Sequence, residues 1–252
     1  MIEIFILSLV QGVTEFLPIS SSSHLILISK YFYFDSNNLS IDVSLHIGSF
    51  FAVITYFYKD IINFYENKIL FLKIFISSFP IMIIGFFLVK SGLVEKIRNI
   101  EIIAWTTLIF GFLLYISDKF KFKKNIENNF NLKTAVIIGM FQVLSLVPGV
   151  SRSGIAITAA RFLKFKRTEA AKISFLISIP ILGAVSGYGL TNILLKDNIN
   201  FTITNLLAII FSFIFSLLTI KYFLKYIRKF SLSIFVIYRI FLGLLLLMLT
   251  YL

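Results

Sequence analysis

Eight apolar stretches occupy most of the chain, and they restrict its fold more than any other feature. Only 14% of the residues are charged, against about 25% in ordinary soluble domains. A helix needs about 20 apolar residues to cross a bilayer, and most of the stretches approach or exceed that length. We therefore expect an all-α polytopic membrane protein with one integral membrane domain over residues 1–252. The stretches cover about 2–28, 45–58, 70–89, 102–117, 134–163, 173–190, 204–220 and 233–252.

The composition excludes several other classes of protein. The chain has no cysteine, which excludes disulfides and thiolate metal sites, and two histidines do not favour a classical zinc site. The net charge of +12 comes from lysines and arginines between the apolar stretches, as in the cytoplasmic loops of membrane proteins. We interpret this charge as a signal of topology and expect no nucleic-acid partner.

Three basic segments predict the orientation of the chain. They lie at 119–133, 161–172 and 221–229, and all three should be cytoplasmic. The apolar stretch 134–163 then begins and ends on the cytoplasmic side, although about thirty residues are too few to cross the bilayer twice. We therefore predict a re-entrant hairpin that turns at "PGVSRSG", where proline and glycine break the helix.

The same argument, followed backward along the chain, makes residues 2–28 a second hairpin that enters from the external face and turns at "LPISSSSH". The other six stretches become transmembrane helices, and both termini become external. The segment 90–99 must then be external despite its Lys and Arg residues. A site in the two turns would open to the external side of the membrane.

The two halves of the chain, about 1–117 and 118–252, are similar in sequence. "EFLPISSSS" aligns with "SLVPGVSRS", which places Ser21 opposite Ser151. "FISSFPI" aligns with "FLISIPI", which places Pro80 opposite Pro180. Similar halves of opposite orientation predict an inverted-topology repeat, in which the site lies where broken helices meet near the membrane midplane.

The second turn has the residue types of an anion site. Arg152 lies in an apolar segment, where a charge costs several kcal/mol unless it is paired or hydrated. Free N–H groups at the following helix start, two serine hydroxyls and a guanidinium would together bind a phosphate. The alternative is that Arg152 pairs with Glu15 only to hold the hairpins together. The candidate anion-binding residues are Gly149, Ser151, Arg152, Ser153 and, before the turn, Gln142.

The first turn has residue types that favour catalysis. Gln11 and Glu15 are four residues apart and share one face of a helix. Glu15 could ligate a hard divalent cation or act as a general base. His24 follows Ser21 by three residues and could activate or position its hydroxyl. Gln11 and Ser20 are also candidates for substrate binding. For Ser20 and its serine neighbours the alternative is small-residue packing between helices.

Two further polar residues have less definite roles. His46 lies at the external end of a predicted span, where an ordinary interfacial residue is the favoured interpretation, although it could border the site with Asp42. Arg239 lies within the last predicted span. It could pair with a buried acid or extend its side chain to the interface, and the sequence favours neither.

The motifs "QGVTEFLPISSSSHL" and "LVPGVSRSG" resemble the two signatures of the undecaprenyl-diphosphate phosphatases, the bacitracin-resistance family. The likeness continues through "LHIGSFFAV", "ISFLISIP" and "FVIYRIFLG", so it covers nearly the whole chain. It implies a bacterial plasma-membrane enzyme that removes the terminal phosphate of undecaprenyl diphosphate, the lipid carrier used in envelope polymer synthesis. It also implies a divalent metal ion such as magnesium or calcium, six spans and two re-entrant hairpins.

The resemblance also implies roles for individual residues. Glu15 and Gln11 would hold the metal or provide the base. Ser21 is the favoured nucleophile, with His24 or Glu15 as its base, and His24 as direct nucleophile is the alternative. Arg152, with Ser151 and Ser153, would bind the diphosphate. The chain departs from the family pattern at Gln11, where Glu is frequent, and at Ala156, where Thr is usual, and the second departure puts catalytic efficiency in question.

A lipid-phosphate transporter is the competing interpretation. Inverted repeats with broken helices are common in secondary transporters, and the anion site could bind a head group without hydrolysing it. The grouping of Glu15, Ser21 and His24 favours an enzyme, because transport requires no nucleophile. The expected partners are therefore a polyprenyl diphosphate and the membrane, and the sequence leaves open whether the chain forms a homodimer.

Overall fold

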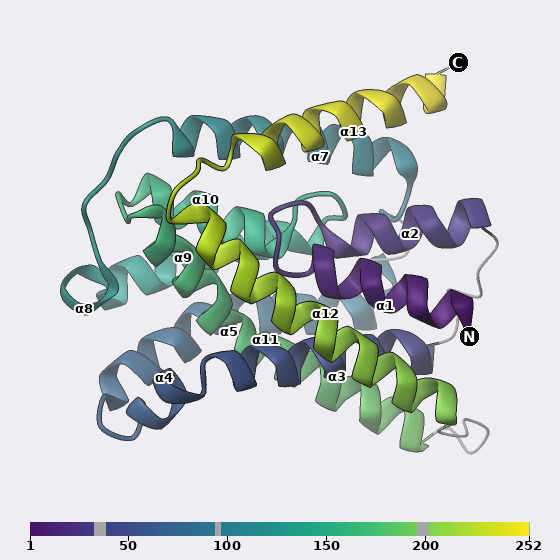
Figure 1. Cartoon of the computed structure of the whole chain (residues 1–252), viewed down its shortest axis with the longest axis horizontal. Coiled ribbons are helices and arrows are strands. Elements are labelled where there is room, and N and C mark those ends of the chain that lie inside the picture. Colours follow the sequence, from purple (N-terminus) through teal and green to yellow (C-terminus); the bar gives the residue numbers. More distant parts are fainter. Residues whose placement is uncertain (33–38, 94–96, 196–201, 252) are drawn as a thin grey trace.

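The computed structural model describes residues 1–32, 39–93, 97–195 and 202–251, and these residues form helices joined by short loops (Figure 1). The described residues contain no strand, only one isolated bridge between Lys124 and Phe165. The predicted all-α fold is confirmed. The helices are α1 (Ile2–Thr14), α2 (Ser21–Phe32), α3 (Leu39–Tyr56), α4 (Tyr58–Asn63), α5 (Lys68–Lys90), α7 (Ile100–Asp118), α8 (Ile126–Asn129), α9 (Leu132–Val143), the 3₁₀ turn η1 (Leu144–Leu146), α10 (Arg152–Phe162), α11 (Arg167–Leu195), α12 (Ile203–Ile227) and α13 (Ser233–Tyr251).

Five helices in the described ranges are long and apolar enough to cross a membrane: α5, α7, α11, α12 and α13. Their outward faces carry large exposed apolar side chains such as Phe79, Phe112 and Phe241, as a lipid-facing surface requires. The chain is therefore a multi-pass membrane protein, as predicted. α3, the sixth predicted span, is also an apolar helix but is shorter than these five.

Asparagine side chains fix the starts of three helices. Asn67, Asn99 and Asn131 accept hydrogen bonds from the backbone N–H three residues later, at 3.0, 2.7 and 2.9 Å. Each bond satisfies an N–H group that has no partner within its own helix. The polar residues between the apolar stretches thus determine where α5, α7 and α9 begin.

Small residues allow α3 and α12 to approach closely. A Cβ atom on Gly48 would lie 2.4 Å from the carbonyl oxygen of Ile209, so only glycine fits there. The Ser49 hydroxyl hydrogen-bonds with Ser212 at 3.2 Å and Ser216 at 3.0 Å across the same interface. Such packing and interhelical hydrogen bonds hold helices together in lipid, where the hydrophobic effect between helices is lost.

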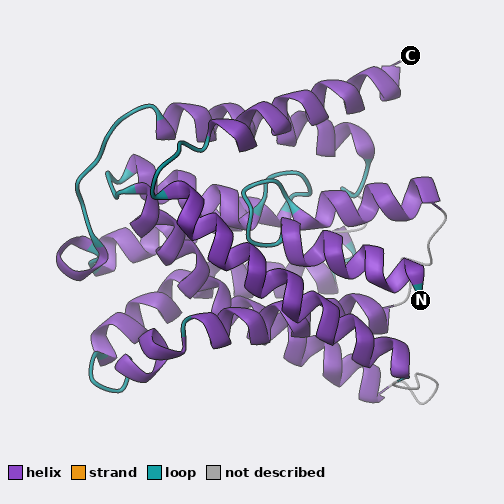
Figure 2. Ribbon diagram, viewed as in Figure 1, coloured by secondary structure: helices purple, strands orange, loops and turns teal. Residues whose placement is uncertain are grey.

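Two broken segments bring their turns into the interior of the helix bundle. α1 and α2 pack together as one hairpin, and α9, η1 and α10 form another. α1 packs on α12, and α9 packs on α5. The turns of both hairpins lie together in the middle of the molecule, away from its two ends (Figure 2). The polar turns therefore lie among the long helices.

The two aligned prolines lie in neighbouring helices. Pro80 is inside α5 and Pro180 is inside α11, and the Ser78 hydroxyl of α5 donates to the Ile177 carbonyl of α11 at 3.1 Å. However, α11 directly follows its hairpin, whereas α3 separates α5 from the first hairpin. The aligned prolines therefore do not occupy equivalent positions in the order of elements.

A buried ionic network closes one end of the bundle. The Asp118 carboxylate accepts from Arg167 at 2.7 Å and from the Leu232 backbone at 2.9 Å, and it lies 3.3 Å from Arg161. These contacts join α7, α10, α11 and the segment before α13. The network lies toward the end with α4 and α8, whereas the N- and C-termini lie on the opposite side of the view (Figure 1).

Candidate active site

The two turns contact each other directly. α1 ends at Thr14, and residues 15–19 form a tight turn that contains Pro18. The Ser153 hydroxyl of the second hairpin donates to the Leu17 carbonyl at 2.8 Å. The sequence prediction that the two polar turns face one another is thus confirmed.

Each turn ends in a serine with an unusual backbone. Ser20 has a φ angle of +76° and Ser151 has a φ angle of +70°, and each directly precedes a helix, α2 or α10. Ser151 Oγ caps α10 by accepting from the Gly154 backbone at 3.1 Å. The left-handed region is uncommon for residues other than glycine, so the two turns share a distinctive local shape.

This shared shape corrects the sequence alignment by one residue. The alignment placed Ser21 opposite Ser151, but in the structure Ser20 matches Ser151 in backbone angle and in its position before a helix. The second turn has one more residue, Gly149, between its proline and this serine. The first residues of α2 and α10 are therefore Ser21 and Arg152, so a hydroxyl and a guanidinium occupy corresponding positions.

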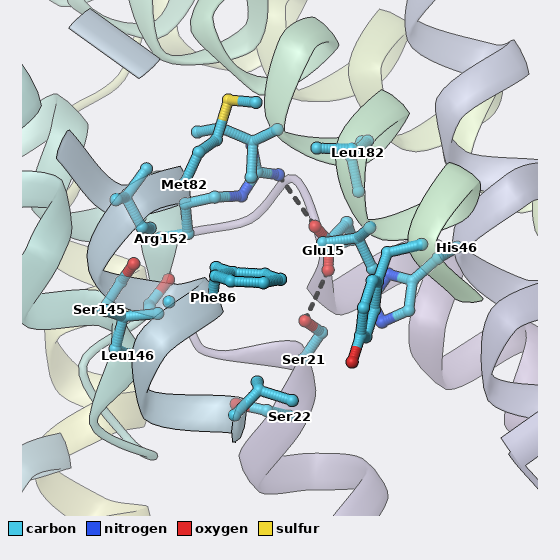
Figure 3. Close-up of a pocket in the computed structure, with 18 of the residues that line it drawn as sticks. Glu15, Ser21, Ser22, His46, Met82, Phe86, Ser145, Leu146, Arg152 and Leu182 are labelled. Atoms are coloured by element: carbon cyan, nitrogen blue, oxygen red, sulfur yellow. Dashed lines mark hydrogen bonds and ion pairs between the residues drawn. The ribbon is translucent and has the colours of Figure 1, made fainter. Parts of the chain in front are cut away.

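Glu15 joins these two side chains. Its Oε1 accepts from Arg152 Nη2 at 2.7 Å, and its Oε2 accepts from Ser21 Oγ at 2.5 Å (Figure 3). Gln11 Nε2 also donates to Oε2 at 3.2 Å. The Glu15 side chain is only 6% exposed and that of Arg152 14% exposed, so this ion pair is largely shielded from solvent. A carboxylate at hydrogen-bond distance from a hydroxyl can accept its proton.

A cavity of about 470 Å³ opens beside this group. One end of its wall is polar and comes from both turns. The remaining wall is apolar and comes mainly from α5 and α11, including Met82, Phe86, Leu182 and Tyr188 (Figure 3). The cavity therefore offers charge at one end and a hydrocarbon-like surface along its length. Its polar lining residues from the turns are Glu15, Ser20, Ser21, Ser22, Ser145, Ser151 and Arg152.

Two helices begin at the cavity wall. α2 begins at Ser21 and α10 begins at Arg152, and both of these residues line the cavity. The first N–H groups of a helix have no intrahelical acceptor, and the helix dipole favours an anion there. Two such starts beside one guanidinium form a binding site suited to a group with more than one phosphate.

Gln11 and His46 lie behind Glu15. Gln11 is fully buried, and its Nε2 lies 3.2 Å from His46 Nδ1 as well as from Glu15. Gln11 Oε1 is buried without a hydrogen-bond partner in the described structure. His46 also lines the cavity. The interpretation of His46 as an ordinary interfacial residue is therefore wrong, and its polar partner is Gln11.

His24 is not directed at Ser21. Its Nδ1 lies 2.6 Å from the Ser20 carbonyl oxygen, and its Nε2 lies 2.5 Å from the Tyr238 hydroxyl. The ring also stacks on the Tyr238 ring. The described contacts include no hydrogen bond between His24 and Ser21, and both imidazole nitrogens have other partners. In this structure the group beside Ser21 is Glu15.

Of the candidate anion-binding residues, only some reach the cavity. Gln142 is fully buried and donates to the Ser77 carbonyl of α5 at 3.1 Å. Gly149 has a φ angle of +94°, and its carbonyl accepts from Arg239 at 2.8 Å. Ser151 and Arg152 line the described cavity wall, whereas Gln142, Gly149 and Ser153 do not. These last three residues support the turn instead.

Arg239 follows neither interpretation of the sequence. It is fully buried, which excludes an interfacial side chain, and its partners in the described part of the chain are backbone carbonyls rather than an acid.

Ala156, the second departure from the family pattern, is also fully buried and is absent from the cavity wall as described.

Sequence reasoning missed most of the cavity wall. Ser145 lines the cavity at the position that the alignment pairs with Glu15, and this pairing was the available signal. The sequence contains no signal that the apolar residues of α5 and α11 line a cavity, because their composition matches that of any lipid-facing helix.

The family model described as "Bacitracin resistance protein BacA" matches residues 4–245. A protein of Pelagibacter ubique (strain HTCC1062) named undecaprenyl-diphosphatase is 49% identical, over 99% of this chain and 98% of that protein. The undecaprenyl-diphosphatase of Jannaschia sp. (strain CCS1) is 37% identical over 98% of both chains. That of Saccharophagus degradans (strain 2-40 / ATCC 43961 / DSM 17024) is 40% identical over 94% of this chain and 93% of its own. The similarity includes both turns.

Proposed function

This chain belongs to the BacA family of bacitracin resistance proteins, and we propose that it hydrolyses undecaprenyl diphosphate to undecaprenyl phosphate and inorganic phosphate. The observation that carries the proposal is the position of Glu15, which holds the Ser21 hydroxyl on one oxygen and the Arg152 guanidinium on the other. A base, a nucleophile and an anion-binding group thus meet at one end of the cavity. Transport of a lipid phosphate would require only the last of these.

Ser21 attacks the terminal phosphorus of the diphosphate while Glu15 accepts the hydroxyl proton. The bond between that phosphorus and the bridging oxygen breaks, and undecaprenyl phosphate leaves with the proton from Glu15. Water then attacks the phosphoserine, giving its proton to Glu15, which returns it to Ser21 Oγ as inorganic phosphate leaves. A hydroxyl nucleophile next to a base is the usual arrangement for such a covalent intermediate.

Arg152 and the starts of α2 and α10 bind the diphosphate. Phosphoryl transfer depends mainly on positioning and on stabilising charge, which fixed donors supply without reorganisation. Arg152 has no hydrogen-bond partner other than Glu15 in the described structure, so its remaining N–H groups are free for phosphate oxygens. Ser151 and Ser20 set the direction of the two helix starts.

Gln11 and Glu15 are suited to hold a divalent metal ion such as magnesium or calcium. Gln11 Oε1 is a buried acceptor without a partner, but the amide atom beside the Glu15 carboxylate is Nε2, so the amide would have to turn over for both oxygens to reach one ion. Carboxylate and amide oxygens are the ligands of hard cations, and Mg²⁺ typically combines one or two carboxylates with substrate phosphates. Since no group of three His, Asp or Glu residues occurs in the described ranges, substrate oxygens would complete the coordination. Such an ion would neutralise charge on the phosphates.

The apolar wall of the cavity accommodates the beginning of the prenyl tail. Phe86 of α5 and Tyr188 of α11 lie edge to face, with ring centroids 6.3 Å apart, and both are about half exposed on the outside of the bundle. The wall thus continues from the charged end of the cavity to the lipid-facing surface.

We further infer that six spans and two re-entrant hairpins form an inverted-topology repeat in the bacterial plasma membrane. The matched left-handed serines and the central position of both turns support this arrangement. The basic segments support a cytoplasmic position for α4 and α8, and an external position for both termini and the opening of the site.

The test is release of inorganic phosphate from undecaprenyl diphosphate by the purified protein in detergent, with and without added Mg²⁺ or Ca²⁺. Ser21→Ala and Arg152→Ala should each abolish release that the wild type shows. Ser178→Ala is the matched control, because Ser178 is buried and donates only within its own helix, to Phe175. Substrate binding without release by folded wild-type protein would reject the enzyme in favour of a transporter.

A further inference from the structure

Arg239 of α13 binds the backbone of both turns. Its Nη1 donates to the Pro18 carbonyl at 3.3 Å and to the Val150 carbonyl at 3.1 Å. Its Nη2 donates to the Gly149 carbonyl at 2.8 Å, and its Nε to the Thr107 carbonyl of α7 at 3.2 Å. One guanidinium thus connects the first turn, the second turn and two long helices.

The surroundings of Arg239 are shaped to hold it in place. A Cβ atom on Gly111 would lie 3.0 Å from Arg239 Cβ, and one on Gly154 would lie 3.0 Å from its Nη1. Glycines at these two positions leave room for the side chain in an otherwise packed interior. Carbonyls in a turn cannot bond within a helix, and in a membrane interior each unpaired carbonyl is costly. The five donors of an arginine suit several such acceptors at once.

The carbonyls that Arg239 binds lie just before the reacting residues. Pro18 is three residues before Ser21, and Gly149 is three residues before Arg152. Glu15 joins the same two turns on the cavity side, through its contacts with Ser21 and Arg152. The turns are therefore connected twice, once by Arg239 and once by Glu15.

Substrate binding and catalysis affect the Glu15 contacts but not the Arg239 contacts. When Glu15 takes up the Ser21 proton, it loses the charge that holds Arg152, whose other N–H groups bind the diphosphate. The contacts of Arg239 lie away from the cavity, since Arg239 is not part of its described wall. They persist when the ion pair opens, together with the bond from Ser153 to the Leu17 carbonyl.

We propose that Arg239 is a positioning residue: it holds the two turns in register, so that Ser21 remains aligned with the phosphate on Arg152 after the Glu15–Arg152 ion pair opens. This inference rests on the proposed function and assigns Arg239 a role in the same site. Misplacing a reacting group by about 1 Å can lower a rate about 100-fold. The loss of Arg239 should therefore affect turnover more than substrate binding.

The experiment compares Arg239→Met and Arg239→Lys with Arg161→Met. Arg161 is the matched control, because it is also buried and donates to backbone carbonyls, those of Phe165 and Phe120, but at the end with the Asp118 network. We expect Arg239→Met to lower kcat on the order of 10- to 100-fold with little change in KM. Arg239→Lys should restore part of kcat, since an ammonium has three donors. Arg161→Met should lower Tm but leave the kcat of the folded enzyme near that of the wild type.

Hydrogen–deuterium exchange of the turn segments 15–22 and 145–153 provides a readout that is independent of activity. Arg239→Met should speed exchange in both turns, and Arg161→Met in neither. If Arg239→Met does not fold, Gly111→Ala keeps every donor but forces Arg239 to shift by a few tenths of an ångström, and kcat should still fall.

Two results would overturn the proposal: unchanged exchange in both turns, or a kcat loss that Arg161→Met matches at an equal loss of Tm. A wild-type protein that releases no phosphate would instead reject the proposed function. The exchange measurement would then still show whether Arg239 holds the turns together.

Discussion

At the scale of single residues, the site depends on the two Glu15 carboxylate oxygens binding different partners. Oε1 binds Arg152, and Oε2 accepts from Ser21 and Gln11. All of these partners are donors, so the position requires a group that only accepts hydrogen bonds. A buried charge left without its partner typically costs about 3–5 kcal/mol, which makes this pair a structural as well as a chemical feature.

Glu15→Gln should lower kcat by a factor of about 10² to 10⁴, the usual contribution of a general base. An amide cannot accept the Ser21 proton, and its NH₂ group would face a donor. The measurement is phosphate release at saturating substrate, with Glu66→Gln as control because Glu66 lies in the exposed segment between α4 and α5. Activity of Glu15→Gln within tenfold of the wild type would place the base elsewhere.

The covalent intermediate should form on serine rather than histidine. His24 has both ring nitrogens engaged by Ser20 and Tyr238, whereas Ser21 lines the cavity. Acid quenching during turnover, followed by mass spectrometry, should find an acid-stable phosphate on Ser21, including in His24→Asn. An acid-labile phosphate that His24→Asn abolishes would transfer the nucleophile's role to His24.

At the scale of elements, the sequence predicts which segments are helical. It predicts poorly the alignment of the two turns and the contacts between residues that are distant in the chain. Both hairpins, 2–28 and 134–163, correspond to broken helical segments, because proline and glycine interrupt apolar runs too short to cross twice. The one-residue error in aligning the turns arose because Gly149 lengthens only the second. The position of His46 beside Gln11 joins residues 35 apart, and such contacts depend on packing that no local pattern encodes.

The second turn also makes a prediction about glycine. A Cβ atom on Gly149 would lie 1.9 Å from the Thr106 hydroxyl oxygen, in a residue whose φ is +94°. Gly92→Ala is the matched control, because Gly92 has a φ of +68° but nothing within 4 Å of its Cβ position. Left-handed backbone alone costs about 1–2 kcal/mol. Gly149→Ala should therefore lower Tm in detergent more than Gly92→Ala does, and an equal effect would contradict the packing around this turn.

At the scale of the whole molecule, the charge pattern and the positions of the termini fit one orientation. The N- and C-termini lie on one side of the view in Figure 1, and α4 and α8 lie on the other. The basic segment between α7 and α9 lies on the side of α8. Because basic segments concentrate in the cytoplasm, we propose that the side with the termini is the external one.

The absence of cysteine makes this orientation directly measurable. Single cysteines at Ser91, after α5, and at Glu66, before α5, are both exposed. A membrane-impermeant maleimide added to intact spheroplasts should label Ser91→Cys, and should label Glu66→Cys only after permeabilisation. The reverse labelling pattern would show that the chain has the opposite orientation in the membrane.

The cavity wall formed by α5 and α11 opens on the flank of the bundle, where Phe86, Val89, Val185 and Tyr188 are about half exposed. A long prenyl chain can reach the charged end of such a cavity without leaving the hydrocarbon, which avoids a cost of about 0.8 kcal/mol for each CH₂ moved into water. Enzyme and substrate then meet by diffusion in the two dimensions of the bilayer. The rate of such an enzyme follows the mole fraction of substrate in the bilayer, so diluting the membrane with inert lipid slows it at constant bulk concentration.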